Sequence, residues 1–500
     1  MVRKGSVAVA KNKVSLPQKD FALGATRPEA IERDDTDLQN RALKQARNTM
    51  ILSTGAIEDR PGSFYLATTT GNNGIEIEPA AGERYILTLV DNGLEIYNET
   101  GILQLSFDTA TWLLTDDPWM TDLGDTILIG SQTNAIHALT YDSGAFSFGL
   151  FVFESGPGGS LNQPYWLYSP DITLTPSALT GSITLTTDKD FFNANSVGQR
   201  LRYVEREIVI DAVTDGQTAT GTVVTELPPT KALTVANASG FQVGEAVEHA
   251  TLGGQGIITA IAGSVIDVLV TKFFTGFDGT GSDLVAPNAK SQINSVADAS
   301  SPAGTTFWDE PLISPARGYP GGCAEHEGRV AFVDFPQAGN VFAASATGTV
   351  NSFSVGTEDD DAIVDTISAS KSQRILHAVS AEDLILLTSQ GAYYQETRDG
   401  SVLSPSNFNP IKFDNMGASK VRPAKVADGV VFVAANGQNV YGAILQGDIY
   451  KAWSLLPLSD FHSHLIKTPV RVTATENDSD RPERFAFIVN SDGTAAIMRW

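Results

Sequence analysis

Four segments of the sequence share one pattern, in which three apolar residues precede three small or polar residues and then a glycine or threonine. A second short apolar segment follows each of them. Three successive apolar residues without alternation indicate a strand that is buried on both of its faces. The four pairs of segments are 127–133 with 135–139, 385–391 with 392–395, 431–437 with 440–444, and 487–493 with 495–498.

The spacing of these paired segments predicts the architecture. The last three copies are 46 and 56 residues apart, counted from Gly391 to Gly437 to Gly493. A repeat of about 40–50 residues that carries buried hairpins is typical of the blades of a β-propeller. The alternative is a β-sandwich whose hairpins happen to resemble one another. We expect a mainly β fold with a propeller-like body of repeated β-hairpin blades.

Turn residues mark two further hairpins. The sequence DNG at 91–93 separates apolar strands at 85–90 and 94–97. Asparagine and glycine accept the positive φ angles of tight hairpin turns. Residues 329–334 and 340–345 form a second pair of expected strands, joined by a turn that contains proline and glycine.

Changes in pattern divide the chain into five expected parts. Glycines at strand bends indicate a small barrel at 231–286, and the polar, small residues of 287–306 indicate a linker. The barrel and its neighbour interrupt the repeat, so we interpret them as an insertion. The parts are an arm and one N-terminal helix in 1–60, the first part of the propeller-like body in 61–160, a β-rich intermediate domain in 161–230, the inserted small β-barrel and linker in 231–300, and the second part of the propeller-like body in 301–500.

The expected helix covers residues 31–50. Asp34 or Asp35 is a suitable N-cap, and the apolar residues that follow are spaced as on one face of a helix. These apolar residues are Leu38, Ala42, Leu43, Ala46 and Met50.

Charge and cysteine content exclude several classes of function. The formal net charge is −24, and phosphate binding needs several placed Lys or Arg residues, so binding duplex DNA as the main activity is disfavoured. The single cysteine, Cys323, excludes an internal disulfide framework or a CxxC metal site and fits a reducing compartment. The N-terminus is a poor signal peptide, and no run of about 18 apolar residues predicts a transmembrane helix.

Three side-chain groups could carry chemistry, and for each a structural role is favoured. Cys323 and His326 could pair as nucleophile and base, but nothing in the sequence orients the histidine. His462 and His464 have metal-like spacing on a strand but lack further ligands. The acidic run 358–361 lacks the ligand spacing of a calcium loop. The glycine-rich runs match no phosphate-binding motif. We therefore expect no catalytic, cofactor or metal site, and no enzyme.

Short motifs in a fixed order resemble the tail nozzle family of short-tailed phages (podoviruses), the tail tubular protein B-like proteins. The opening hairpin at 84–97 is similar to one that follows the N-terminal motif in that family. The motifs are Arg47, Asn48, Gly55 and 60–62 (RPG), then Trp308, 317–320 (RGYP), 326–329 (HEGR), 344–348 (ASATG), Asn351, Phe353 and the acidic 359–363, then 403–407 (LSPSN), Gly417, 450–452 (YKA) and His464.

The resemblance implies a structural virion protein at the distal end of the tail. It implies a homo-hexameric tube that is assembled in the host cytoplasm, attached to the tail adaptor below the portal, and in reach of tail fibres or spikes. Genomic DNA would pass through the lumen without specific binding, and no membrane insertion is implied. The 231–286 barrel need not be shared by the family, and relatives usually continue beyond the equivalent of Trp500, which leaves the closure of the last blade open.

A host-glycan-binding or glycan-degrading β-propeller is the alternative function. Exposed aromatic side chains could stack on sugars, although Trp and Tyr are more often buried in a core. A glycosidase would also need two carboxylates roughly 5–10 Å apart in a cleft. The aromatic candidates are Trp112, Trp119, Tyr165, Trp166 and Trp308.

Overall fold

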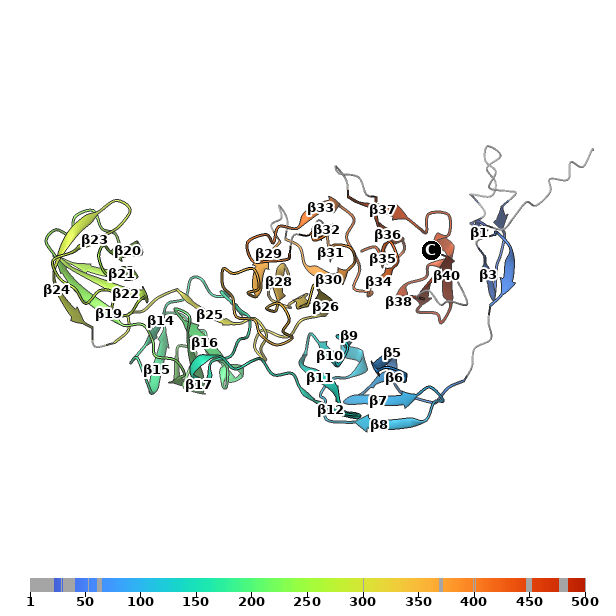
Figure 1. Ribbon diagram of the computed structural model, residues 1–500, viewed down its shortest axis with the longest axis horizontal. Coiled ribbons are helices and arrows are strands. Elements are labelled where there is room, and N and C mark those ends of the chain that lie inside the picture. The colour runs from blue at the N-terminus through green and yellow to red at the C-terminus, as the bar shows by residue number, and fades with distance from the viewer. Residues whose placement is uncertain are drawn as a thin grey trace, which may run out of the picture. The chain divides into compact units, whose positions relative to one another are not determined.

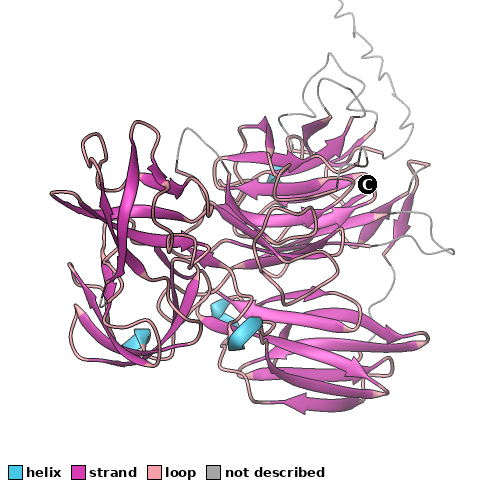
Figure 2. Ribbon diagram, turned by 60° about the vertical axis from the view of Figure 1, so that its left-hand side comes forward, coloured by secondary structure: helices cyan, strands magenta, loops and turns pink. Residues whose placement is uncertain are grey.

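The chain is built almost entirely from antiparallel β-strands (Figures 1 and 2). The computed structural model describes residues 22–27, 29, 41–52, 54–60, 65–299, 301–367, 372–398, 400, 402–446, 452–475 and 484–499. The chain forms two compact units. Unit 1 comprises Met1–Leu66, Val379–Asp399 and Pro410–Trp500, and unit 2 comprises Ala67–Ala378 and Gly400–Asn409.

Three four-stranded meander sheets in unit 2 have the form of propeller blades. In each sheet, strands that follow one another along the chain are neighbours and pair antiparallel. The first blade contains β5 (Asn72–Ala80), β6 (Glu83–Val90), β7 (Gly93–Asn98) and β8 (Leu103–Phe107). The second contains β9 (Trp119–Asp122), β10 (Thr126–Ser131), β11 (Asn134–Asp142) and β12 (Ala145–Leu150). The third contains β26 (Gly322–His326), β27 (Arg329–Val333), β28 (Val341–Ala344) and β29 (Ile363–Thr366).

Three further blades follow, and the chain passes from unit 2 to unit 1 within the first strand of the fourth. The last of them has three strands among the described residues. The fourth blade contains β30 (Ile375–Ser380), β31 (Leu384–Thr388), β32 (Gly391–Gln395) and β33 (Ile411–Asp414). The fifth contains β34 (Ala424–Val426), β35 (Gly429–Val433), β36 (Val440–Leu445) and β37 (Trp453–Pro457). The sixth contains β38 (Pro469–Ala474), β39 (Phe485–Asn490) and β40 (Ala495–Arg499).

Successive blades within a unit share hydrophobic cores. In unit 2, Leu89 of the first blade and Ile129 of the second belong to one buried cluster, and Leu128 and Phe332 join the second blade to the third. In unit 1, one cluster joins the fourth and fifth blades and another joins the fifth and sixth. Every residue of β31 and β35 is buried. The apolar triplets are therefore central strands, which confirms the expectation of a propeller-like body of repeated hairpin blades.

A seven-stranded sheet lies between the second and third blades in the sequence. Its order is β13-β25-β16-β17-β18-β15-β14, so a strand from beyond residue 300 completes it. The strands are β13 (Tyr165–Trp166), β14 (Leu174–Pro176), β15 (Ser182–Thr187), β16 (Arg200–Tyr203), β17 (Arg206–Val213), β18 (Thr218–Val223) and β25 (Trp308–Pro311). The short 3-10 helices of the described chain are η2 (Leu114–Asp116), η3 (Pro157–Gly159), η4 (Ala194–Ser196) and η5 (Ser463–Leu465).

The inserted barrel is confirmed as a closed six-stranded barrel with the order β19-β22-β21-β20-β23-β24. Its last strand covers part of the segment expected as a linker, because β24 closes the barrel by pairing with β19. The linker expectation for 287–306 is therefore wrong over 290–298. The strands are β19 (Thr230–Val235), β20 (Ala246–His249), β21 (Gln255–Ala262), β22 (Val265–Lys272), β23 (Asp283–Val285) and β24 (Lys290–Asp298).

The expected N-terminal helix is not confirmed. Residues 31–40, like most of the arm, lie outside the described residues, and 41–50 contain turns, one short strand at 42–43 and the first two residues of another at 49–51. Asn48 has a φ of 55°, which a continuing helix cannot accommodate. Strand pairing thus overrides the helical spacing of the apolar residues. The pairs are β1 (Gly24–Ala25) with β2 (Ala42–Leu43), and β3 (Thr49–Ile51) with β4 (Ile57–Asp59).

No helix in the described ranges is long and apolar enough to span a membrane.

Candidate functional site

Cys323 and His326 lie on β26 but do not form a catalytic pair. Residues three apart on a strand point to opposite faces of the sheet, so the two side chains diverge. His326 is buried, whereas the partly buried Cys323 packs against the core shared by the second and third blades. Burial raises the pKa of the Cys323 thiol to about 12. A nucleophilic cysteine needs the opposite shift.

We expect Cys323 to be almost unreactive in the folded protein. With a thiol pKa of about 12 instead of the usual 8.5 or so, the thiolate population at pH 8 falls about a thousandfold. Labelling with a disulfide reagent should therefore be roughly a thousandfold slower in buffer than in 6 M guanidinium chloride, where the same thiol is unfolded. Equal rates under the two conditions would contradict this burial.

The histidine and acidic candidates also have structural surroundings. His462 precedes η5, and its Nδ1 lies 2.9 Å from the carbonyl oxygen of Ala25. His464 is the middle residue of η5, and partial burial lowers the pKa of its imidazole. The Asp361 carboxylate accepts a hydrogen bond from the Glu358 amide at 2.9 Å. Within the part of the chain that the structure describes, no three potential ligands are grouped for a metal ion.

The acidic run is held by a buried arginine. Arg329, at the start of β27, is 0% exposed. Its guanidinium donates to the carbonyl oxygens of Ser345 and Asp361 at 2.7 Å and to that of Asp359 at 2.5 Å. The backbone of this loop is therefore fixed from inside, while Glu358, Asp359 and Asp360 are exposed.

Most of the aromatic residues considered for sugar stacking belong to the core. Trp112, Trp119, Tyr165 and Trp308 are buried, and Trp166 packs partly buried against the second and third blades. The three buried indoles donate to the carbonyl oxygens of Val90, Pro320 and Ile172 at 2.8–3.0 Å. These rings are not available as a flat sugar-binding surface.

The most unusual site in unit 2 is a set of buried and partly buried ion pairs around β25 in the seven-stranded sheet. Asp309 accepts from Arg202 of β16 through both oxygens, at 2.8 and 2.5 Å. The same guanidinium lies over the ring of Tyr165, 4.1 Å from its centroid. Glu207 of β17 accepts from Arg200 at 2.7 Å and from the Tyr165 hydroxyl at 2.9 Å. Each of these carboxylates has a guanidinium partner, which is the condition for tolerating charges away from solvent.

Glu310, the next residue on β25, pairs with Arg317 of the RGYP motif. The guanidinium donates to the two carboxylate oxygens at 2.8 and 2.6 Å, and its third nitrogen donates to Gln337 at 2.7 Å. Burial raises the pKa of Glu310, and the charge of Arg317 opposes that shift. Arg317 also lies 4.5 Å from the ring centroid of Tyr168. The pair is thus fixed from several sides.

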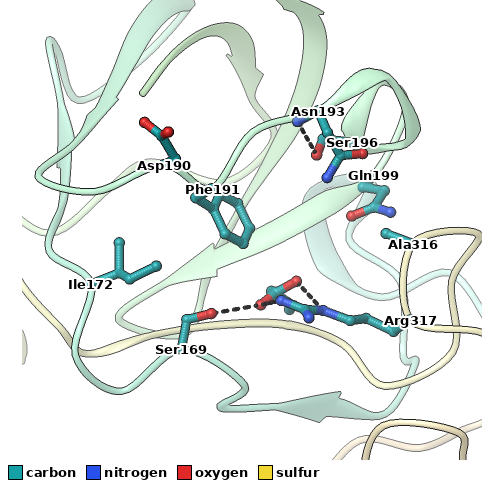
Figure 3. A pocket seen from close by; sticks show the side chains of 10 residues that line it. Ser169, Ile172, Asp190, Phe191, Asn193, Ser196, Gln199, Ala316 and Arg317 are labelled. Carbon is teal, nitrogen blue, oxygen red and sulfur yellow. Dashed lines mark hydrogen bonds and ion pairs between the residues drawn. The ribbon is translucent and has the colours of Figure 1, made fainter. Parts of the chain in front are cut away.

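A pocket of about 240 Å³ opens beside the Glu310–Arg317 pair (Figure 3). Its polar wall includes Ser169, Asn193 and Gln199, and Ile172, Phe191 and Ala316 supply apolar surface. In Figure 3 the ring of Phe191 points across the pocket toward Arg317. The walls come from the chain before β14, the loop and η4 before β16, and the turn after β25. Pairing of β25 with β16 brings these segments together.

The ion pairs and the pocket were not predicted from the sequence, although Arg317 and Tyr165 had been singled out for other reasons. The sequence RLRY at 200–203 contains one indication of the site, because its arginines alternate with apolar residues along a strand. Both guanidinium groups therefore lie on one face of the sheet, where buried arginines need carboxylate partners. The partner strand, however, carries Asp309 and Glu310 more than one hundred residues later, beyond the barrel. No local pattern predicts that pairing.

Known proteins that resemble this chain are found only among solved structures. No protein-family model and no curated protein matches the chain. Among solved structures, the computationally designed Ika8 protein is 12% identical over 87% of this chain and 99% of its own, with a TM-score of 0.24. The β-propeller domain of Myceliophteria thermophila Cps50 (Swd1) is 9% identical over 87% and 98%, with a TM-score of 0.28. Kluyveromyces lactis Hsv2 is 8% identical over 83% and 94%, with a TM-score of 0.28. Scores this low carry no argument about function.

Proposed function

We propose that this chain is a structural virion protein, the tail nozzle of a short-tailed phage, which forms a homo-hexameric tube on the portal adaptor and conducts DNA. The observation that carries the proposal is the order of motifs along the sequence that resembles the nozzle family. Two of these motifs supply arginines that form buried polar contacts in unit 2. Arg317 of RGYP pairs with buried Glu310, and Arg329 of HEGR fixes the backbone of the acidic loop.

The acidic composition supports the same function. A channel wall with many carboxylates repels phosphate, so passing DNA meets no site at which it is held. The excess of 58 acidic over 34 basic residues gives each chain a formal charge of −24, and six copies around an axis would concentrate that charge. The proposal therefore places acidic side chains on the lumen wall.

Imaging of the purified full-length protein tests the assembly. We expect negative-stain images to show rings with a central channel, and native mass spectrometry to show a species of six 53.2-kDa chains. A lone globule of one chain at every concentration used would contradict the nozzle proposal.

A second measurement tests the conduction role. Short duplex DNA should show no anisotropy change with the assembled ring even at low salt, because an acidic wall gives no counterion release. Salt-dependent binding, or a basic or neutral channel wall in a map of the ring, would contradict the proposed role of the charge.

A further inference from the structure

The last strand of the first blade has an edge that pairs with no strand among the described residues. β8 ends the order β5-β6-β7-β8, so it is paired only on its β7 side (Figure 1). An edge strand presents unpaired backbone N–H and C=O groups, and proteins usually protect such an edge with charged residues or proline. The five residues of β8, LQLSF, include neither. This edge is therefore open to a further strand.

The side chains along this edge describe what would fit it. Ile102, Leu103 and Leu105 are 61%, 48% and 39% exposed. Glu99, in the turn between β7 and β8, and Asp108, directly after β8, are exposed at the two ends of the strand. The complementary occupant is a short apolar strand with a positive charge at each end.

The sequence around β8 is acidic over a long stretch. Residues 85–188, which include β7, β8 and the second blade, contain nine Asp and three Glu residues and no Lys or Arg. Carboxylates concentrated in this way attract a basic segment. The second blade also ends in an edge strand, β12, but Leu150 is the only large apolar residue among its exposed positions. The edge of β8 offers more apolar surface to a partner.

The start of the same sequence has the complementary pattern. Residues 6–10, SVAVA, equal β8 in length and lie between Lys4 and Lys11. The first 19 residues, called here the basic segment, contain five Lys or Arg residues and no Asp or Glu, in a chain of net charge −24. The basic segment lies outside the described residues, which begin at Ala22.

We propose that residues 6–10 of one copy add to the edge of β8 in a neighbouring copy, as a fifth strand of the first blade. Lys4 and Lys11 would then lie near the carboxylates of Glu99 and Asp108. The basic segment and the edge are different surfaces, so the contact is heterologous, the kind that closes into rings. This contact presupposes the ring assembly proposed above and supplies one means of holding its neighbouring copies together.

The length of the connecting chain is sufficient for such an exchange. Gly24 and Ala25 are fixed by their pairing with β2. The 13 residues from Lys11 to Leu23 can span about 40 Å when extended. The basic segment can therefore reach well beyond the strand pair that anchors it.

Hydrogen exchange on the assembled full-length protein tests the strand addition. Reversing both charges at the ends of the edge, in the double variant Glu99→Lys with Asp108→Lys, should repel the basic segment. The amides of residues 6–10, and those of β8 that point away from β7, should exchange at least about tenfold faster in this variant than in wild type. Both substituted side chains are exposed, and thermal unfolding followed by circular dichroism establishes that the variant is folded.

A charge exchange separates this contact from a general effect of charge. Adding Lys4→Glu and Lys11→Glu to the double variant restores opposite charges and should restore slow exchange at residues 6–10. Asp142→Lys, an exposed substitution beside the edge strand β12, is the matched control and should exchange as wild type.

Carbodiimide cross-linking of wild-type rings tests whether the contact lies between copies. Rings assembled from a mixture of unlabelled and isotope-labelled chains should give peptides in which Lys4 or Lys11 of one label is joined to Glu99 or Asp108 of the other. Chymotrypsin is the suitable protease, because residues 85–188 contain no site for trypsin.

Each other outcome overturns the strand addition in a recognisable way. Rings in which residues 6–10 exchange as fast as in the double variant overturn it and leave the nozzle proposal intact. Links to Asp142 or Glu154 instead show that β12 is the edge used. Links confined to one label show that the basic segment pairs within its own chain. A protein that remains a single chain in native mass spectrometry overturns the nozzle proposal as well.

Discussion

Replacing Arg329 by methionine is expected to lower the free energy of unfolding by about 3–5 kcal/mol, since it leaves buried polar groups unpaired. Methionine fills a similar space but cannot donate to the carbonyl oxygens of Ser345, Asp359 and Asp361. Each of these acceptors loses its guanidinium donor in a place where the wild-type side chain is 0% exposed. The acidic loop should then open locally.

Chemical denaturation and hydrogen exchange measure this effect together. Exchange should accelerate over residues 345–361 in Arg329→Met more than elsewhere in unit 2. The matched control is Arg84→Met, because the Arg84 side chain is 55% exposed and its guanidinium pairs with Glu78 at 3.2 Å. Exposed ion pairs contribute about 0–1 kcal/mol, so this variant should remain near wild type. A free energy for Arg329→Met within 1 kcal/mol of wild type would show that water satisfies the loop instead.

The blades could be predicted because their information is local. An apolar triplet, a turn and a second apolar strand lie within about 15 residues, and the hairpins at 385–395 and 431–444 pair as β31 with β32 and β35 with β36. The turn before Gly93 also has the expected form, with Asn92 at a φ of 62°. Glycine is required at position 93 for a different reason, because a Cβ there would overlap the backbone of Phe107 on β8. That contact depends on a neighbouring strand and cannot be read from the turn.

Errors arose where pairing partners are distant or where local spacing competes with pairing. Residues 41–50 have helical apolar spacing, yet Thr49 and Met50 pair with Asp59 and Glu58 in a hairpin. Lys290–Asp298 looked like a linker because its composition is polar. Its burial alternates, with Ser291 and Ile293 buried, which is the pattern of a barrel strand that has one face in the core and one exposed to solvent.

The pocket could not be predicted for the same physical reason. Its walls are separated in sequence by the whole barrel, and they meet only after β25 pairs with β16 across about one hundred residues. The chemistry-bearing groups are also ordinary residues whose environment makes them unusual. Gln199 is distinctive only because it is buried in the pocket wall, and Glu310 only because Arg317 is its charged partner there.

Replacing Asp383 by asparagine is expected to destabilise unit 1 by about 3 kcal/mol, although the two side chains have the same shape. Asp383 precedes β31 and is 0% exposed. One carboxylate oxygen accepts from the amides of Thr397 and Arg398 at 3.0 and 3.2 Å, and the other accepts from the Arg398 guanidinium and, at 2.6 Å, from the indole of Trp453.

All four contacts of Asp383 are donors, and that makes asparagine unsuitable. Whichever way its amide is turned, the NH₂ group faces two donors and accepts nothing. We expect faster hydrogen exchange at residues 397–398 and at the Trp453 indole, and a lower denaturation midpoint. Asp460→Asn, at an exposed loop position of the same unit, is the control and should change stability by less than about 0.5 kcal/mol. If Asp383→Asn changes the free energy of unfolding as little as that control does, the four donors must be hydrogen-bonded to water in the variant. The buried carboxylate would then not be what holds the fourth and fifth blades together.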